Sequence, residues 1–129
     1  MTRKESREQA FILLFEYSFT GDTADELFET ATEAGCFIED EYCVSVVKTA
    51  IEKVEETDEI ISRYAKGWKT ERLSKVVLAA LRLAVTEINY FTDIPNSVSI
   101  NEAVEIIKKY ATAQDAVFAN GILGSVVKG

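Results

Sequence analysis

Pro95 is the only proline in a chain of 129 residues, and only six glycines accompany it. Because proline and glycine are the residues least compatible with helix interiors, the chain contains few obligatory breaks. Apolar side chains recur at helical spacing between these breaks, and no pair of alternating segments indicates a β-hairpin. The sequence therefore predicts an all-α fold, a compact bundle of helices within one domain.

The boundaries of the helices follow from capping and breaking residues. Thr23 and Glu26 have the spacing of a capping box, and Gly35 ends the segment that follows. Nearly every side chain from Val76 to Val85 is apolar, which predicts a buried central helix. The expected helices cover residues 3–19, 24–34, a long stretch within 39–68 that kinks near 56–58, 76–85, a stretch that starts near Asn96 or at a capping box formed by Ser99–Glu102, and 115–128.

The net charge of −8 is distributed unevenly along the chain. Residues 1–20 carry three cations and three carboxylates, residues 21–60 carry two and thirteen, and residues 61–129 carry nine and six. A negative total disfavours nucleic-acid binding only as an average, because phosphates contact local Lys and Arg side chains. Since the acidity is concentrated in the middle stretch, the rest of the chain is free to present a positive surface.

The residues on which most enzymes and metal sites depend are missing. The chain has no histidine and no glycine-rich motif of the kind that binds phosphates. Cys36 and Cys43 are expected about 10 Å apart along one helix, which is too far for a disulfide. Two cysteines are also too few for a structural zinc site. The sequence therefore predicts a protein that is not an enzyme and has no cofactor or metal.

The chain also lacks the signals of a membrane or secreted protein. No apolar run reaches the roughly 18 residues that span a bilayer, and the first residues lack a signal-peptide pattern. Unpaired cysteines suit a reducing compartment. These features predict a cytoplasmic protein with no membrane partner.

Two groups of cations are candidates for binding RNA. In the larger group a cation recurs at every third position, which would give a positive ridge if the segment were helical; ordinary solubilising charges are the alternative. This group comprises Arg63, Lys66, Lys69, Arg72 and Lys75. The smaller group, at the start of the first helix, comprises Arg3, Lys4 and Arg7.

The last helix contains an aromatic residue and a glycine that bear on RNA binding. Phe118 either stacks on a base or belongs to the core. The flanks of Asn120-Gly121 do not alternate, so we expect the helix to continue through this pair rather than turn. Because a helical glycine costs about 1 kcal/mol relative to alanine, Gly121 indicates the close approach of another helix or of a ligand. The sequence does not separate these two explanations.

Several motifs in about residues 61–127 resemble those of the NusB family. The most specific are I-P-x-x-V-x-I-N-E-A-V-E at 94–105 and F-x-N-G-x-L at 118–123. Shorter matches are Trp68 followed by Glu71-Arg72-Leu73, and Leu81-Arg82-Leu83-Ala84 followed by Glu87-Ile88. In the first helix, the family's R-x-x-A-x-x-x-L-(Y/F) opening is matched by Arg7, Ala10, Leu14 and Phe15.

The resemblance implies a bundle of about seven helices in two subdomains, an N-terminal lobe of about residues 1–66 and a C-terminal lobe of about 67–129. It also implies a transcription antitermination factor that binds the boxA element of nascent ribosomal RNA transcripts. Its direct protein partner would be NusE, a small-subunit ribosomal protein. Other antitermination factors and RNA polymerase would be reached indirectly.

The resemblance implies functional residues as well. It assigns RNA contacts to the N-terminal cations and to the start of the last helix, and it assigns contacts with the protein partner to Phe15 and Glu87. With the basic group and Asn120 added from the sequence pattern, the expected RNA-binding residues are Arg3, Lys4, Arg7, Arg72, Lys75, Asp115, Phe118 and Asn120.

A second reading keeps the same fold and changes the function. The chain would then be a NusB-like protein-interaction module or a homodimer with little RNA binding of its own. The sequence leaves the oligomeric state open, along with the role of the acidic residues 21–60.

Overall fold

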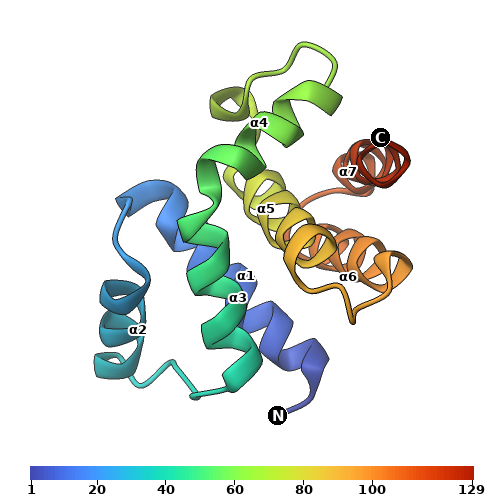
Figure 1. The fold of residues 1–129 in the computed structure, drawn as a ribbon. Coiled ribbons are helices and arrows are strands. Elements are labelled where there is room, and N and C mark those ends of the chain that lie inside the picture. The colour runs from blue at the N-terminus through green and yellow to red at the C-terminus, as the bar shows by residue number, and fades with distance from the viewer.

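A computed structural model describes all residues from Met1 to Gly129. The chain forms seven α-helices and one short 3-10 helix, and it contains no strand. The predicted all-α class is therefore confirmed (Figure 1). The elements are α1 Arg3–Thr20, α2 Ala24–Glu33, α3 Glu41–Glu52, α4 Val54–Tyr64, η1 Thr70–Arg72, α5 Lys75–Tyr90, α6 Asn96–Tyr110 and α7 Ala113–Lys128.

Helix α5 is the centre of the bundle, as its apolar sequence predicts. Every side chain from Val77 to Glu87 is buried, and α5 packs against α1, α3, α4, α6 and α7. Helix α2 lies at the periphery, beside α1 and α3 (Figure 1). The two halves of the chain thus share one core through α5. Helix α4, which falls within residues 1–66, packs mainly on α5 and α7.

The break in the long third pattern lies at Lys53, so the predicted kink near residues 56–58 is misplaced. Helix α3 ends at Glu52 and α4 begins at Val54. The break changes the direction of the chain, because α3 packs against α1 and α5 whereas α4 packs against α5 and α7. If α3 and α4 formed one straight helix, the buried Ile61 would not reach the contact of α4 with α5 and α7.

The connection between α4 and α5 is an irregular turn that bears on the functional site. Helix α4 ends at Tyr64. Shortly after it, Lys66 and Gly67 have positive φ angles of 51° and 92°. Both angles lie in the left-handed region that glycine tolerates best. The break predicted at Gly67 is therefore present, and the turn leads into η1.

Capping chemistry sets several other ends. The capping box of α2 forms as predicted, with the Glu26 N–H donating to the Thr23 hydroxyl at 3.2 Å and the Thr23 N–H donating to the Glu26 carboxylate at 2.8 Å. Helix α6 begins at Asn96 rather than at Ser99, which is buried inside the helix. Helix α7 continues through Asn120-Gly121 as expected.

Two further expectations concern the cysteines and membranes. Cys43 is buried in α3, whereas Cys36 is exposed in the linker before that helix, so the two do not share one helix as the sequence suggested. Both are free thiols. None of the helices combines the length and apolar character that a bilayer-crossing segment requires.

Candidate nucleic-acid interface

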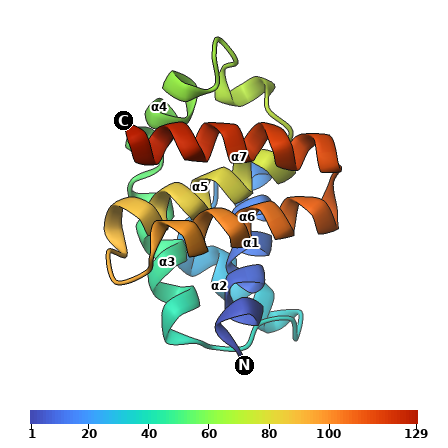
Figure 2. The ribbon, with the colours of Figure 1, turned by 90° about the vertical axis from the view of Figure 1, so that its right-hand side faces the viewer.

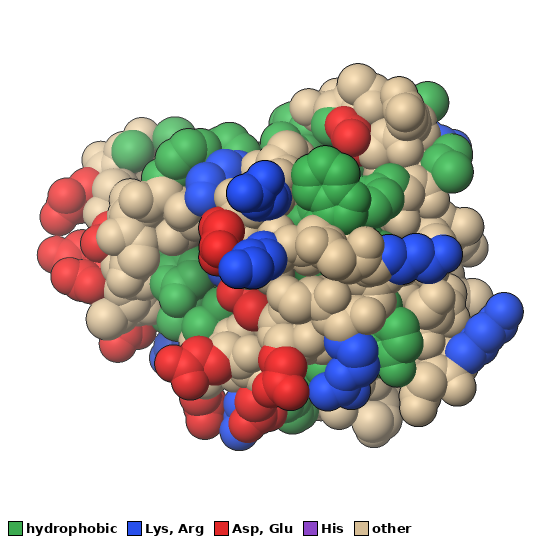
Figure 3. All heavy atoms as spheres, turned by 90° about the horizontal axis from the view of Figure 1, so that it is seen from above, with side chains coloured by type: hydrophobic (Ala, Val, Ile, Leu, Met, Phe, Trp, Pro, Cys, Tyr) green, Lys and Arg blue, Asp and Glu red, His purple; other side chains and the backbone are tan.

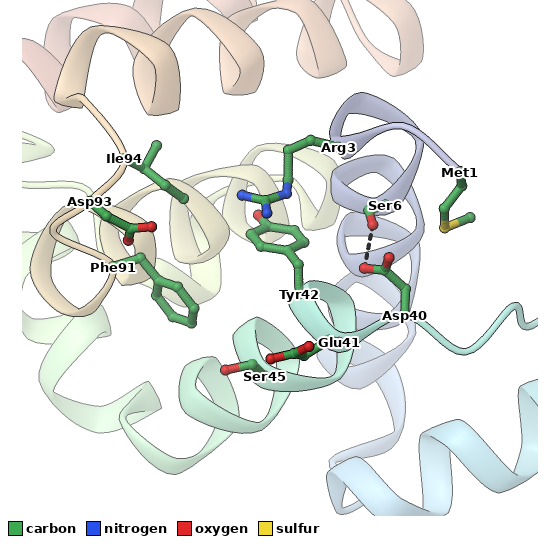
Figure 4. Close-up of a pocket in the computed structure, with 10 residues that line it drawn as sticks. All are labelled: Met1, Arg3, Ser6, Asp40, Glu41, Tyr42, Ser45, Phe91, Asp93 and Ile94. Carbon is green, nitrogen blue, oxygen red and sulfur yellow. Dashed lines mark hydrogen bonds between the residues drawn. The ribbon is translucent and has the colours of Figure 1, made fainter.

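The three N-terminal cations have different surroundings. Arg3 and Lys4 are exposed on the first turn of α1. Thr2 and Glu5 form a capping box at the N-terminus of this helix. The Arg3 guanidinium lies 4.3 Å from the centre of the Tyr42 ring, and Figure 4 shows this pair beside a pocket. The Lys4 ammonium lies 3.5 Å from the Glu102 carboxylate. These two cations are available at the surface, each beside a neighbouring side chain.

Arg7 is instead part of a buried polar group, which we call the Arg7–Glu87 cluster. Its Nε donates to the Glu87 carboxylate at 2.7 Å, and its Nη1 lies 3.4 Å from Glu102. The Ser99 hydroxyl donates to Glu87 at 2.7 Å, and the Tyr42 hydroxyl donates to the same carboxylate. The cluster joins α1, α3, α5 and α6 inside the bundle.

This burial corrects two site assignments. A direct RNA contact by Arg7 and a partner contact by Glu87 both require exposed side chains, but Arg7 is 4% exposed and Glu87 is completely buried. The structure makes them partners of each other. Their separation of 80 positions in the sequence hides this pairing, since neither residue lies in a pattern that points to the other.

The protonation of the cluster follows from burial and charge. Burial, with the adjacent Glu87 carboxylate, raises the pKa of Tyr42 well above its ordinary value, so the phenol remains a hydrogen-bond donor. For Arg7, burial lowers the pKa, but the hydrogen bond and charge of Glu87 outweigh it and the net shift is upward. The cluster therefore keeps its arginine charged and its tyrosine neutral across the physiological pH range.

The pocket beside Arg3 has mixed charge. It encloses about 460 Å³ between the starts of α1 and α3 and the connection from α5 to α6 (Figure 4). Asp40, Glu41 and Asp93 line it together with Arg3. The Asp40 carboxylate caps α3 and accepts a hydrogen bond from Ser6, and this bond holds the pKa of Asp40 below its usual value. Three carboxylates around one guanidinium make the interior of this pocket unsuitable for phosphate, which leaves the solvent-exposed side of Arg3 as its available surface.

The cations at every third position do not form one ridge, because the helix they would need stops at Tyr64. Arg63 pairs with Glu59 at 3.4 Å. The Lys75 ammonium lies 5.8 Å from the centre of the Phe19 ring, at the end of α1. Arg72 alone of these three lines a pocket with aromatic walls. The predicted group is therefore divided among separate parts of the surface.

We call this second cavity the aromatic pocket. It encloses about 430 Å³ between the turn that precedes α5 and the start of α7. Its lining residues are Trp68, Arg72, Leu73, Ser74, Val77, Gln114, Asp115 and Phe118. The structure thus brings three predicted site residues, Arg72, Asp115 and Phe118, into one cavity.

The aromatic residues of this pocket are accessible to a ligand. Phe118 is half-buried and packs partly against the core, and the rest of its side chain is exposed to solvent. Trp68 is 52% exposed. In the sequence, Trp68 is noted only as part of a family motif. It is the single tryptophan of the chain and lies among cations, and these two features could have indicated a residue that stacks on a base.

A smaller hollow of about 300 Å³ adjoins the aromatic pocket along α7. It shares Trp68 and Phe118 and extends past Gly121 to Ser125. Asn120 is exposed on the same helix but lines neither cavity. A Cβ atom added to Gly121 would meet nothing within 4 Å. Helix packing within the chain therefore does not require this glycine, and the approach of a ligand is the explanation that is left to test.

Gly121→Ala tests that explanation. We expect the substitution to stabilise the protein by up to about 1 kcal/mol, because alanine is the better helix former and the added methyl group meets open space. RNA affinity should fall if a ligand approaches the backbone here. Thermal unfolding and RNA binding would be measured on the same preparation, with Gly124→Ala as the control. Unchanged RNA affinity would remove Gly121 from the interface.

Charged side chains and exposed aromatic side chains lie on different parts of the remaining surface. Seen from above, carboxylates gather toward the side of α2, while most cations of this face lie toward its centre and the side of α7 (Figure 3). Phe15 and Phe19 contact each other edge to face, with ring centres 5.1 Å apart. Phe19 is 65% exposed. This end of α1 offers an apolar surface separate from the aromatic pocket.

Comparison with known sequences extends the match over almost the entire chain. Residues 4–128 match the model of the NusB family. The transcription antitermination protein NusB of Acetivibrio thermocellus is 43% identical over 99% of this chain and 90% of its own length. That of Natranaerobius thermophilus is 40% identical over 98% of this chain and 94% of its own.

Solved structures agree with the sequence comparison. A crystal structure of the antitermination factors NusB and NusE in complex with double-stranded RNA superposes with a TM-score of 0.87, at 31% identity, over 98% of this chain and 96% of that one. The solution structure of NusB from Aquifex aeolicus superposes with a TM-score of 0.83, at 35% identity, over 98% of this chain and 87% of that one. Fold, motifs and full-length identity therefore agree that this chain belongs to the NusB family, a family of transcription antitermination proteins rather than enzymes.

Proposed function

We propose that this protein binds the boxA element of nascent ribosomal RNA transcripts together with NusE, and that it acts as an antitermination factor in the cytoplasm. Its relatives carry the name transcription antitermination protein NusB. A similar solved complex contains NusB, NusE and RNA. The structural observation that carries the proposal is the aromatic pocket, in which Trp68 and Phe118 lie beside the unpaired cation Arg72.

The proposed RNA surface has two parts, one at the start of α7 and one at the start of α1. In Figure 2 the start of α1, then α6, then α7 follow one another from the bottom to the top of the view. At the α7 end a base stacks on the aromatic side chains, and Arg72, Asp115 and Asn120 supply polar contacts. At the α1 end Arg3 and Lys4 contact phosphates. The Arg7–Glu87 cluster holds the start of α1 in place below them and does not itself touch RNA.

The apolar end of α1 is the proposed NusE surface. Phe15, matched to a partner-facing position by the family resemblance, lies against the exposed Phe19. Lys75 lies beside Phe19, so we assign this cation to the partner surface in place of the RNA surface. Aromatic side chains such as Phe15 and Phe19 are enriched in protein interfaces, whose rim is polar and can include a cation such as Lys75.

Fluorescence anisotropy with labelled RNA tests the proposal. A boxA RNA and a scrambled RNA of the same composition would be titrated with the protein, with and without NusE. We expect boxA to bind more tightly than the scrambled RNA, and NusE to increase the difference. Equal affinities in both conditions would contradict RNA recognition.

Light scattering over a concentration series tests the alternative of a protein-interaction module. The RNA-binding proposal expects any self-association to decrease when boxA RNA is added, because RNA would compete for the exposed surface. Dimers that RNA leaves unchanged would favour the interaction module.

A further inference from the structure

We propose that the aromatic pocket is a binding site for one unpaired guanine base of the RNA. The inference deepens the proposed function, because it rests on RNA binding and names the base that this part of the interface selects. It depends on three properties of the pocket: its size, its aromatic walls, and a carboxylate that has no partner within the protein.

The size and walls of the pocket suit a single base. A volume of about 430 Å³ lies within the range of small-ligand sites. Trp68 and Phe118 come from two different segments, one from the turn before η1 and one from α7. Leu73 and Val77, both buried, form the apolar floor. Stacking on such side chains tolerates every base, because each base has a flat π face, so selectivity must come from polar groups.

Asp115 is the polar group that distinguishes among bases. Its backbone N–H donates to the Thr112 hydroxyl, but its carboxylate makes no ion pair and accepts no hydrogen bond, although Arg72 lines the same pocket. A carboxylate repels phosphate and only accepts hydrogen bonds. The donors that RNA offers to it are the ribose 2′-OH and the N–H groups of the bases, and only the base donors differ from one base to another.

Guanine matches these acceptors best. Its Watson–Crick edge carries two adjacent donors, N1–H and the N2 amino group, which fit the two oxygens of one carboxylate. Uracil offers one N–H, and adenine and cytosine each offer one amino group on that edge. Arg72 is likewise free of ion pairs, and arginine is the side chain that most often donates to O6 and N7 of guanine. The pair Asp115 and Arg72 is thus complementary to guanine alone.

The first turn of a helix also favours acidic residues for reasons unrelated to RNA, because the helix dipole is positive there. The test must therefore separate a carboxylate that reads a base from one that only stabilises α7. Measuring ratios of affinities achieves this, since loss of helix stability or of overall charge affects every RNA alike.

The experiment uses uridine 12-mers with one central guanine, inosine or adenine, titrated by anisotropy in the presence and absence of NusE. Inosine differs from guanine only by lacking the N2 amino group. We expect the guanine RNA to bind about tenfold more tightly than the inosine RNA, because a hydrogen bond to a charged group is lost. In Asp115→Ala this ratio should fall close to one. Glu71→Ala, which removes an exposed carboxylate outside the pocket, should leave the ratio unchanged.

The outcomes separate this inference from the proposed function. Equal binding of the guanine, inosine and adenine RNAs by the unmodified protein would overturn the guanine site and leave RNA binding intact. A guanine preference that persists in Asp115→Ala would overturn it too, because the preference would then come from elsewhere or from NusE. Binding of no RNA in either condition would overturn both proposals. Circular dichroism melting would establish that each variant is folded.

Discussion

Arg7→Ala is expected to destabilise the protein by about 3–5 kcal/mol, because it leaves the buried Glu87 carboxylate without its cation. The Tyr42 and Ser99 hydroxyls would still donate to Glu87, but neither carries a positive charge. Glu87→Ala should cost a similar amount, since it leaves Arg7 unpaired. Urea denaturation measures both losses as shifts of the unfolding midpoint.

Lys4→Ala is the matched control for this prediction. Lys4 also pairs with Glu102, but it is exposed, and surface ion pairs contribute about 0–1 kcal/mol. A loss for Arg7→Ala no larger than that of Lys4→Ala would contradict the structural role of the cluster. If Arg7→Ala weakened RNA binding while leaving the free energy of unfolding unchanged, the family-based assignment of Arg7 to the RNA surface would be right instead.

Phe118→Ala should weaken RNA binding by about 1–3 kcal/mol, or roughly 5- to 150-fold, because a stacked base loses its aromatic partner. Trp68→Ala should have an effect of the same order. Since Phe118 is only half-buried, its removal should cost less than the roughly 3–5 kcal/mol typical of a core phenylalanine. Anisotropy titrations and thermal melts of the same variants measure the two effects separately.

Tyr90→Ala is the control for aromatic loss. Tyr90 is exposed at the far end of α5 and lines neither described pocket, so its removal should leave RNA affinity unchanged. A Phe118→Ala variant that loses stability like a core substitution, yet binds RNA with unchanged affinity in its folded fraction, would contradict the stacking role.

Local sequence signals predicted most of the fold because their causes are local. The capping pair Thr23 and Glu26 are three residues apart, and the all-apolar segment from Val76 to Val85 needs no distant partner to indicate burial. The sequence predicts this break at the wrong position, near residues 56–58 instead of Lys53, because its position depends on the packing of α4 against α5 and α7. Tertiary packing of this kind has no signature within a short window of sequence.

The site was predictable only in part, for the same reason. Arg72, Asp115 and Phe118 were each named from motifs, but only the folded chain shows that they line one cavity with Trp68. The regular spacing of cations suggested a ridge that the turn at Lys66 and Gly67 does not permit. The buried pairing of Arg7 with Glu87 reversed two surface assignments, because periodicity shows which residues are apolar but not which charged residues are enclosed.

The fluorescence of Trp68 tests the central claim most directly, because this is the only tryptophan in the chain and it lies in the aromatic pocket. Single-stranded boxA RNA would be titrated into the protein with NusE, with a mixture of NusE and RNA subtracted as background. We predict a change in Trp68 emission that saturates at the RNA concentration at which anisotropy saturates. Anisotropy that reports binding while Trp68 emission stays constant would show that RNA binds elsewhere on the molecule.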